Sequence, residues 1–365
     1  MPAHIISSEE QRGRMLHTPI PKLIVSLSIP TLASQLISVF YNTADTYFVS
    51  KLSTSASAAV GVVFSLMSII QAFGFGIGMG CGSIISRSLG NRDNERADRT
   101  ASSAFFFAAA VGLLICIAGL CTLRPLMRLL GSTETILPYS ESYARIILLA
   151  APVMCASFVL NNTLRSEGEA MLSMYGICAG GLLNVALDPL FIFAFDMGIA
   201  GAALATVSGQ LLGMTVGFFL VSGRKDLSLS PRRFRPSGDV IRDIYRIGLP
   251  AIVMQSLAAF MTLGLNKIMA LFSESAVFIL GVYFKIQSFI FMPVFGLNNG
   301  LTPVVGYNYG AGERKRVRKI FGLSLGVNVL IMLVGTVICF AAATVFSSSS
   351  TLRATSSPPA CPRYG

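Results

Sequence analysis

Nine apolar segments, each about as long as a bilayer-spanning helix, constrain this chain more than any other feature. A transmembrane helix needs about 20 consecutive, mostly apolar residues. Since 53% of the 365 residues are hydrophobic and only 12% are charged, a water-soluble fold of this size could not bury them. The sequence therefore predicts an all-α polytopic membrane protein. Its expected spans are approximately 22–49, 56–86, 99–122, 139–162, 171–195, 198–221, 248–272, 275–305 and 320–345.

The distribution of Lys and Arg predicts which side of the membrane each loop faces. If the N-terminus is cytoplasmic, twenty Lys and Arg residues lie in inward-facing segments, and only Lys51, Arg124 and Arg128 lie in outward-facing ones. Positive charge gathers in the cytoplasmic loops of membrane proteins. These loops account for the net charge of +11, so we expect no nucleic-acid partner. A specific site for anionic lipid in the basic loops is the alternative interpretation.

An internal repeat relates the two parts of the chain. When the sequence is shifted so that Pro30 falls on Pro250, glycines, prolines and aromatic residues coincide without a gap as far as Arg96 and Arg316. Six spans fit in one period, and an even number returns the chain to its starting side. The two copies are therefore expected to be parallel, related by an axis along the membrane normal. The other coinciding pairs include Gln35 with Gln255, Gly76 with Gly296 and Gly90 with Gly310.

The spans and the repeat divide the chain into five predicted parts. These are a cytoplasmic N-terminus at 1–21, an N-terminal lobe of six transmembrane helices at 22–221, a basic cytoplasmic linker at 222–247, a partial C-terminal lobe of three transmembrane helices at 248–346, and a Ser/Pro-rich tail at 347–365 that does not look native. A complete second copy would need three more helices. A truncated gene or a shifted reading frame would produce this pattern, and a natural nine-span protein is the alternative.

Polar residues occupy one face of the first span. Ser34, Ser38, Tyr41 and Asp45 are about one helical turn apart, so they share a face that must meet protein or water rather than lipid. A charge inside a bilayer costs at least ~2.5 kcal/mol, which makes Asp45 a functional candidate. A structural hydrogen-bond acceptor near the interface is the alternative. Pro30 removes one backbone hydrogen bond from the same helix, and we expect the helix to bend there.

Two further spans carry polar groups at a similar depth. Asn184 and Asp188 are four residues apart in the fifth span, and Thr206 lies in the sixth. We expect these side chains and Asp45 to meet in the outer half of the first lobe. Two carboxylates in one dry site can share a proton, or with amide and hydroxyl oxygens they can hold a small cation such as Na⁺. Asp188 precedes Pro189, so capping of a broken helix is its alternative role.

Other charged and metal-binding residue types are sparse in the predicted spans. Lys285 falls near the middle of the eighth span and is a functional candidate without an identified partner. Glu141 and Arg145 are expected to pair locally. The only histidines, His4 and His17, precede the first span, and the cysteines have no CxxC spacing. We therefore expect no cofactor and no metal beyond Na⁺ at the cation site.

Six stretches of the sequence carry a family resemblance. They are "IPTLASQLISVFYNTADTYFVSKL", "GSIISRSLGNRDNERA", "NNTLRSEGEAMLSM", "GGLLNVALDPLFIF", "GLPAIVMQS" and "KIQSFIFMPVFGLNNGLTPVVGYNYGAGERKRV". These stretches resemble the multidrug and toxic compound extrusion (MATE) family, in its bacterial branch. The resemblance implies twelve helices in two six-helix lobes around a central cleft, of which the second lobe here is incomplete.

The resemblance also implies an activity. It implies H⁺- or Na⁺-coupled export of amphipathic, often cationic drugs from a cell, across a bacterial inner membrane. The partners would be small-molecule substrates and the lipid bilayer, with no obligate protein partner and no enzymatic activity. A chain lacking the last three helices would be an inactive form. A lipid-linked oligosaccharide flippase of similar architecture and a membrane-embedded transferase are the alternatives.

The resemblance assigns roles to particular residues. The family's cation site matches Asp45, Asn184, Asp188 and Thr206, and the family's helix-bending proline matches Pro30. Polar residues of its substrate cavity match Tyr143 and Asn161, and Tyr41 on the face of Asp45 is expected to line the same cavity.

Overall fold

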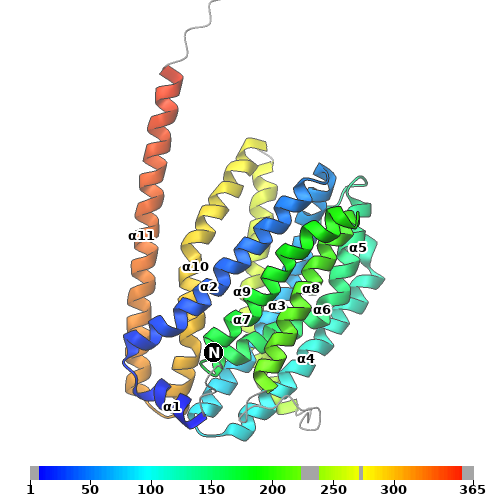
Figure 1. Cartoon of the computed structure of the whole chain (residues 1–365). Coiled ribbons are helices and arrows are strands. Elements are labelled where there is room, and N and C mark those ends of the chain that lie inside the picture. Colours follow the sequence, from blue (N-terminus) through cyan, green and yellow to red (C-terminus); the bar gives the residue numbers. More distant parts are fainter. Residues whose placement is uncertain (1–7, 223–237, 271–273, 356–365) are drawn as a thin grey trace, which may run out of the picture.

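A computed structural model of the protein describes the backbone of residues 8–222, 238–270 and 274–355. Side chains are described over the same residues, except beyond Val337 and at scattered positions between 258 and 289. Every element in this part of the chain is helical (Figure 1). In chain order the elements are α1 (Ser8–His17), α2 (Ile20–Ser50), α3 (Thr54–Gly90), α4 (Asn94–Cys121), α5 (Leu123–Leu129), α6 (Leu137–Ser166), α7 (Ala170–Pro189), the π-helix η1 (Leu190–Ala194), α8 (Gly198–Ser222), α9 (Gly238–Ala270), α10 (Glu274–Gly310) and α11 (Arg314–Thr355).

Seven of these helices, among the described residues, are long and apolar enough to cross a bilayer. They are α2, α3, α4, α6, α7 with η1, α8 and the described part of α11, and each covers one of the predicted spans. The prediction of an all-α polytopic membrane protein is confirmed. The other two predicted spans fall on α9 and α10, where many side chains lie outside the described residues. The backbone of α11 remains helical to Thr355, past the predicted end of its span at 345.

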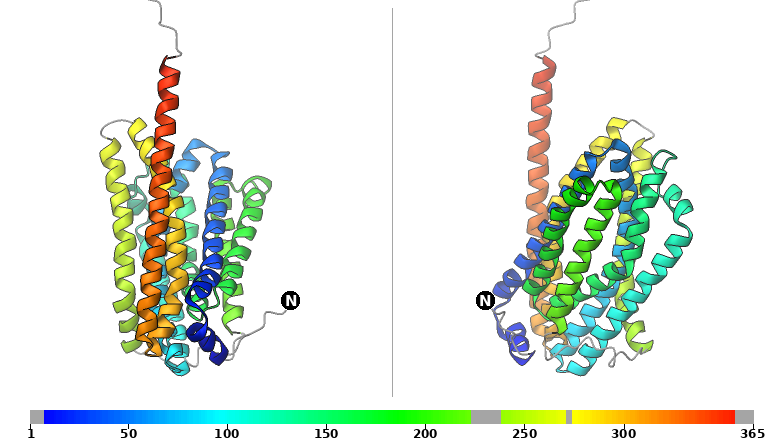
Figure 2. Two further views of the ribbon diagram at one scale, coloured as in Figure 1. Left: turned by 90° about the vertical axis from the view of Figure 1, so that its left-hand side faces the viewer. Right: turned by 45° about the vertical axis from the view of Figure 1, so that its right-hand side comes forward.

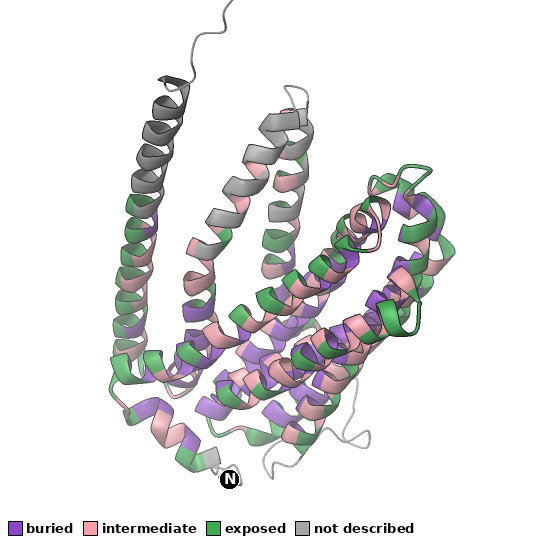
Figure 3. Ribbon diagram, turned by 45° about the horizontal axis from the view of Figure 1, so that its top comes forward, coloured by how far each residue is buried: buried purple, intermediate pink, exposed green. Residues whose placement is uncertain are grey.

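Helix α6 lies at the centre of the N-terminal helices, whereas α11 lies at the edge of the molecule. Helix α6 packs against α3, α4 and α8, whereas α11 packs mainly on α10 and extends beyond the other helices (Figures 1 and 2). Within the apolar window of each helix, 67% of residues are buried in α6 but only 11% in α11. The burial colours follow the same division (Figure 3). Exposed apolar side chains on α11 are what a surface in contact with lipid requires.

Small residues bring α7 and α8 into backbone contact. A Cβ atom added to Gly180 would lie 2.5 Å from the carbonyl oxygen of Gly209, and the reverse distance is also 2.5 Å. Gly176 meets Gly213 one turn further along the same seam. Glycines at such positions let transmembrane helices approach closely without a hydrophobic driving force. This seam sets the depth at which side chains of α7 meet those of α8.

The predicted sequence repeat is visible in the backbone of two corners. The turn that connects α3 to α4 has the same conformation as the turn that connects α10 to α11, and we call these two turns the corners. Arg92 has a φ of 63° and Gly312, its counterpart, has a φ of 79°. The backbone N–H groups of Asp93 and Glu313 each donate across 2.9 Å to the carbonyl oxygen five residues earlier. The sequence repeat therefore reflects a structural repeat at this end of the bundle.

Contacts between the two corners are reciprocal. Gly90 packs against the backbone of Tyr307, and Gly310 packs against the backbone of Arg87. Gly310 is the counterpart of Gly90, and Arg87 is the counterpart of Tyr307, so the repeat exchanges the two contacts. A Cβ on either glycine would collide with a carbonyl oxygen, so only glycine allows α3 and α10 to cross here. This reciprocity is what an axis of two-fold pseudosymmetry between parallel repeats produces.

Helix α1, which the sequence analysis did not predict, lies across this corner. Arg12 Nε donates to the carbonyl oxygen of Gly90 at 2.9 Å, and Asn308 Nδ2 donates to the carbonyl oxygen of Met15 at 3.2 Å. Met15 is completely buried. The segment expected to be a cytoplasmic N-terminus thus joins α3 to α10.

One predicted ion pair is wrong. Glu141 pairs with Arg124 of α5 at 3.4 Å and not with Arg145. The short helix α5, which the sequence analysis did not anticipate, brings Arg124 to α6. The side chain of Lys285 and residues 223–237 of the predicted linker lie outside the described residues.

Candidate functional site

The polar face of α2 satisfies most of its hydrogen bonds within the helix. Ser34 Oγ donates to the carbonyl oxygen of Pro30 at 2.8 Å, Ser38 Oγ to that of Ser34 at 3.0 Å, and Asn42 Nδ2 to that of Ser38 at 2.7 Å. The helix continues through Pro30 without a break. Asp45 follows on this side of the helix and is 8% exposed. Its Oδ1 atom is buried and has no hydrogen-bond partner among the described residues.

Asp188 occupies the last turn of α7, where the helix changes its winding. Pro189 has no backbone N–H, and the chain widens into η1 after it. Such π-helical turns frequently occur at functional sites. Asp188 is completely buried, and neither carboxylate oxygen has a hydrogen-bond partner in the described part of the chain. Capping of a broken helix does not account for this carboxylate, because no backbone N–H among the described residues donates to it.

The glycine seam brings Asn184 of α7 to Thr206 of α8. A Cβ at Gly209 would lie 3.1 Å from the Asn184 Cβ, so a larger residue would displace Asn184. Asn184 Nδ2 donates to Thr206 Oγ1 at 3.4 Å. The Asn184 Oδ1 atom is buried and unpaired within the described structure. The amide therefore presents its acceptor on the side where Asp188, one turn further along α7, presents its carboxylate.

Tyr143 of α6 completes the arrangement. Its side chain is buried and lies near Thr206, within electrostatic reach of Asp45 and Asp188. The two carboxylates also lie close enough to interact with each other. Four helices, α2, α6, α7 and α8, therefore contribute to one buried polar cluster. We call Asp45, Tyr143, Asn184, Asp188 and Thr206 the acidic cluster.

The other two predicted cavity residues occupy different places. The ring of Tyr41 packs on Gly181, on the same two helices as Asp45 and Asp188. Asn161 lies five turns after Tyr143 on α6, which is about 27 Å along the helix axis. Its Oδ1 accepts a hydrogen bond from Ser173 Oγ at 3.1 Å. The structure does not bring Asn161 together with the acidic cluster, because five turns of α6 separate it from Tyr143.

The chemistry of the acidic cluster suits a cation. Four acceptor oxygens, one on Asp45, one on Asn184 and two on Asp188, are buried without a donor among the described residues. Buried polar atoms are rarely left unpaired in folded proteins. Carboxylate, amide and hydroxyl oxygens are the donors that hard cations prefer, and a carboxylate pair also accepts a proton. The residues therefore fit H⁺ or Na⁺.

The structure adds polar groups that the sequence analysis missed. A cavity of about 330 Å³ lies between α3, α10 and α11, and Asn298 and Asn328 line it. Asn328 Nδ2 donates to Asn298 Oδ1 at 3.0 Å. Both asparagines interrupt apolar spans, which is the signal that could have identified them.

Comparison with known proteins decides the family. The model of the MatE family matches residues 30–190 and 250–357. The chain belongs to the MatE family. The resemblance to multidrug and toxic compound extrusion transporters is thereby confirmed.

Relatives and solved structures agree with this assignment. The multidrug export protein MepA of Staphylococcus aureus (strain NCTC 8325 / PS 47) is 30% identical over 325 residues, which cover 87% of this MatE family chain and 72% of MepA. A multidrug resistance MATE family transporter of the MOP superfamily, solved in an outward-facing conformation, is 30% identical with a TM-score of 0.82. That match covers 90% of this chain and 73% of the transporter.

A structure from Pyrococcus furiosus has the same fold. This MOP superfamily transporter is 29% identical with a TM-score of 0.82, over 95% of this chain and 76% of the transporter. These relatives are named as transporters or export proteins, which agrees with the prediction that the MatE family protein is not an enzyme. The chain is therefore a multi-pass membrane protein with the MATE fold.

Proposed function

We propose that this MatE family protein is a cation-coupled antiporter that exports amphipathic, often cationic drugs and toxic compounds from bacterial cells. The names of the MepA relatives support export of several compounds. One observation carries the coupling: buried carboxylates from α2 and α7 lie within electrostatic reach of each other, and three of their oxygens have no donor among the described residues. An exchangeable cation would supply the missing positive charge.

The acidic cluster would couple ion binding to movement of α2. Asp45 belongs to α2, whereas Asn184 and Asp188 belong to α7, and Thr206 belongs to α8. A proton or Na⁺ that enters from the outer side would neutralise the carboxylates and draw these helices together. Loss of the cation would leave two negative charges that repel each other. Bending of α2 at Pro30, where one backbone hydrogen bond is missing, would convert this change into release of the drug.

Efflux measurements on two aspartate variants test the coupling. Asp45→Asn and Asp188→Asn each remove a charge while preserving shape, and we expect both to abolish gradient-driven efflux of a cationic dye from proteoliposomes. Asp196→Asn is the matched control, because Asp196 is exposed in the loop just after η1. Imposing either a pH gradient or a Na⁺ gradient identifies the coupling ion. Wild-type efflux in both aspartate variants would reject the proposed site.

Orientation belongs to the same proposal. We infer that the N-terminus, α1 and the two corners face the cytoplasm, because the basic loops lie at that end. In a chain whose native cysteines are replaced by serine, a cysteine introduced at the exposed Lys315 should react with an impermeant maleimide only after cells are opened. Labelling of intact cells would reverse the orientation and with it the direction of transport.

A further inference from the structure

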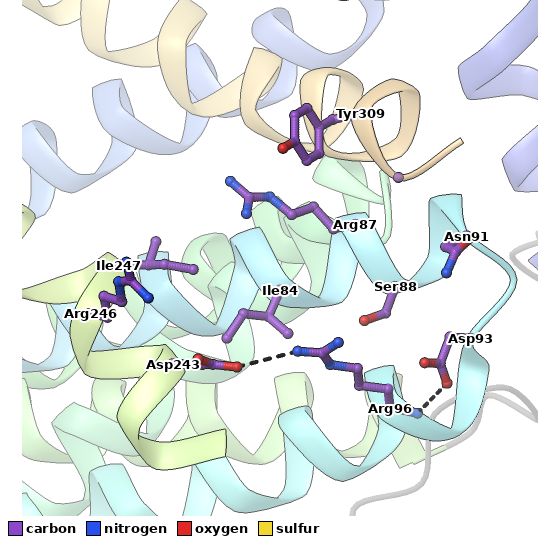
Figure 4. A pocket seen from close by; sticks show the side chains of 11 residues that line it. Ile84, Arg87, Ser88, Asn91, Asp93, Arg96, Asp243, Arg246, Ile247 and Tyr309 are labelled. Carbon is purple, nitrogen blue, oxygen red and sulfur yellow. Dashed lines mark hydrogen bonds and ion pairs between the residues drawn. The ribbon is translucent and has the colours of Figure 1, made fainter. Parts of the chain in front are cut away.

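A polar cavity of about 590 Å³ lies at the α1 end of the bundle, between α3, α4, α9 and α10 (Figure 4). Its volume falls within the usual range for small-molecule sites, about 300–1,000 Å³. Three arginines from three different helices line it: Arg87 from α3, Arg96 from α4 and Arg246 from α9. The cavity is separate from the acidic cluster, and the proposed ion coupling does not use it.

Two of the three arginines keep their charge available. Arg96 pairs with Asp243 at 3.3 Å. The other lining carboxylate, Asp93, accepts a hydrogen bond from the backbone N–H of Arg96 at 3.0 Å and caps α4. Figure 4 shows both interactions. Within the described part of the chain, neither Arg87 nor Arg246 has a carboxylate partner.

Arg87 is held in a geometry that leaves its donors free. Its guanidinium lies over the ring of Tyr309, 5.0 Å from the ring centroid. Stacking occupies the face of a guanidinium but not the N–H groups in its plane. Those N–H groups match two oxygens of a phosphate. The hydroxyl of Ser88, a buried residue of the cavity wall, adds another donor.

The pseudosymmetry indicates what kind of occupant fits. Asn308 and Arg316 are the counterparts of Ser88 and Arg96 in the second repeat. Both donate hydrogen bonds to backbone carbonyl oxygens of the chain at the end of α1 and just after it. Acceptor oxygens of the chain itself therefore lie against these two counterparts. The cavity at Arg87 presents donors to space that no described residue occupies.

We propose that this cavity binds a phosphate group, carried either by the headgroup of an anionic phospholipid in the adjacent leaflet or by a free phosphate compound. The phosphate bridges Arg87 in the first repeat and Arg246 in the second. Basic pockets between transmembrane helices on the cytoplasmic side bind anionic headgroups in this manner. A bound phosphate holds the two repeats together at this end.

The experiment compares lipid and phosphate binding on the full chain. Purified protein is titrated in detergent with phosphatidylglycerol, phosphatidylcholine or inorganic phosphate, while its melting temperature and its retained phospholipid are measured. The variants are Arg87→Gln, Arg246→Gln and Arg87→Lys. Arg242→Gln is the matched control, because it removes the same charge from α9 one turn away and outside the cavity. We expect phosphatidylglycerol, but not phosphatidylcholine, to raise the melting temperature of the wild type.

The outcomes separate the two sources of phosphate. Removing one charged donor should weaken phosphatidylglycerol binding about tenfold or more in Arg87→Gln and Arg246→Gln. Arg87→Lys should retain part of the affinity, and Arg242→Gln should keep wild-type affinity. Stabilisation by inorganic phosphate alone would assign the site to a free phosphate compound. Equal loss in Arg242→Gln, or no response to either ligand in well-folded wild type, would overturn the proposal.

Discussion

Asn184 of α7 donates a hydrogen bond to Thr206 of α8 across 3.4 Å, and this contact joins the two helices one turn from Asp188. Thr206 accepts this hydrogen bond, and Tyr143 of α6 lies near it. We expect Thr206→Val to slow gradient-driven efflux about twofold to tenfold, the effect of one lost hydrogen bond. Thr206→Ser keeps the hydroxyl and should transport at nearly the wild-type rate. Equal losses in both variants would assign Thr206 a packing role instead.

The α7–α8 seam should tolerate an added methyl group at one glycine and reject it at another. A Cβ at Gly209 would lie 2.5 Å from the Gly180 carbonyl oxygen, whereas at Gly217 its nearest neighbour would be 3.6 Å away. Gly209→Ala should therefore destabilise the protein by about 1–3 kcal/mol and impair efflux, because it separates Asn184 from Thr206. Gly217→Ala should be neutral or slightly stabilising. Melting temperatures in detergent, measured side by side, check both expectations.

The two-fold pseudosymmetry predicts that matching glycine substitutions at the two corners destabilise the protein by similar amounts. Gly90→Ala and Gly310→Ala each place a methyl group against a backbone carbonyl oxygen that cannot move aside. We expect both to lower the melting temperature by similar amounts. Gly322→Ala on α11 is the control, since its added methyl group would meet no atom within 4 Å. A large effect at one corner and none at the other would contradict the reciprocal contact.

The docking of α1 should depend on buried contacts rather than on its surface ion pair. Asn308→Ala leaves the Met15 carbonyl oxygen without its side-chain donor, and we expect a loss of about 1–3 kcal/mol in stability. Glu9→Gln breaks the pair with Arg92, whose side chains are 71% and 64% exposed. That change should cost less than about 1 kcal/mol. Thermal unfolding of both variants ranks the two contacts, and a larger effect of Glu9→Gln would contradict this interpretation.

Much of the fold and part of the acidic cluster could be predicted from the sequence. A face of polar residues on an apolar helix identifies Asp45 without any tertiary information, because lipid excludes a charge. Spacing of four residues places Asn184 and Asp188 on one face of α7. Asn161 stays a predicted residue of the substrate cavity, and the structure places it five turns along α6 from Tyr143. The spacing rule wrongly paired Glu141 with Arg145 on α6, because a local rule cannot anticipate Arg124 arriving from α5.

The sequence by itself determined the main spans, their expected direction and the internal repeat, because apolar length, charge asymmetry and periodicity are properties of the linear chain. Only the tertiary structure decided which polar groups share a site. The glycine contacts of α7 with α8 and of α3 with α10 depend on backbones approaching to within van der Waals distance. That approach sets the partner of Thr206, the position of α1 and the arginine-lined cavity, none of which any local pattern contains.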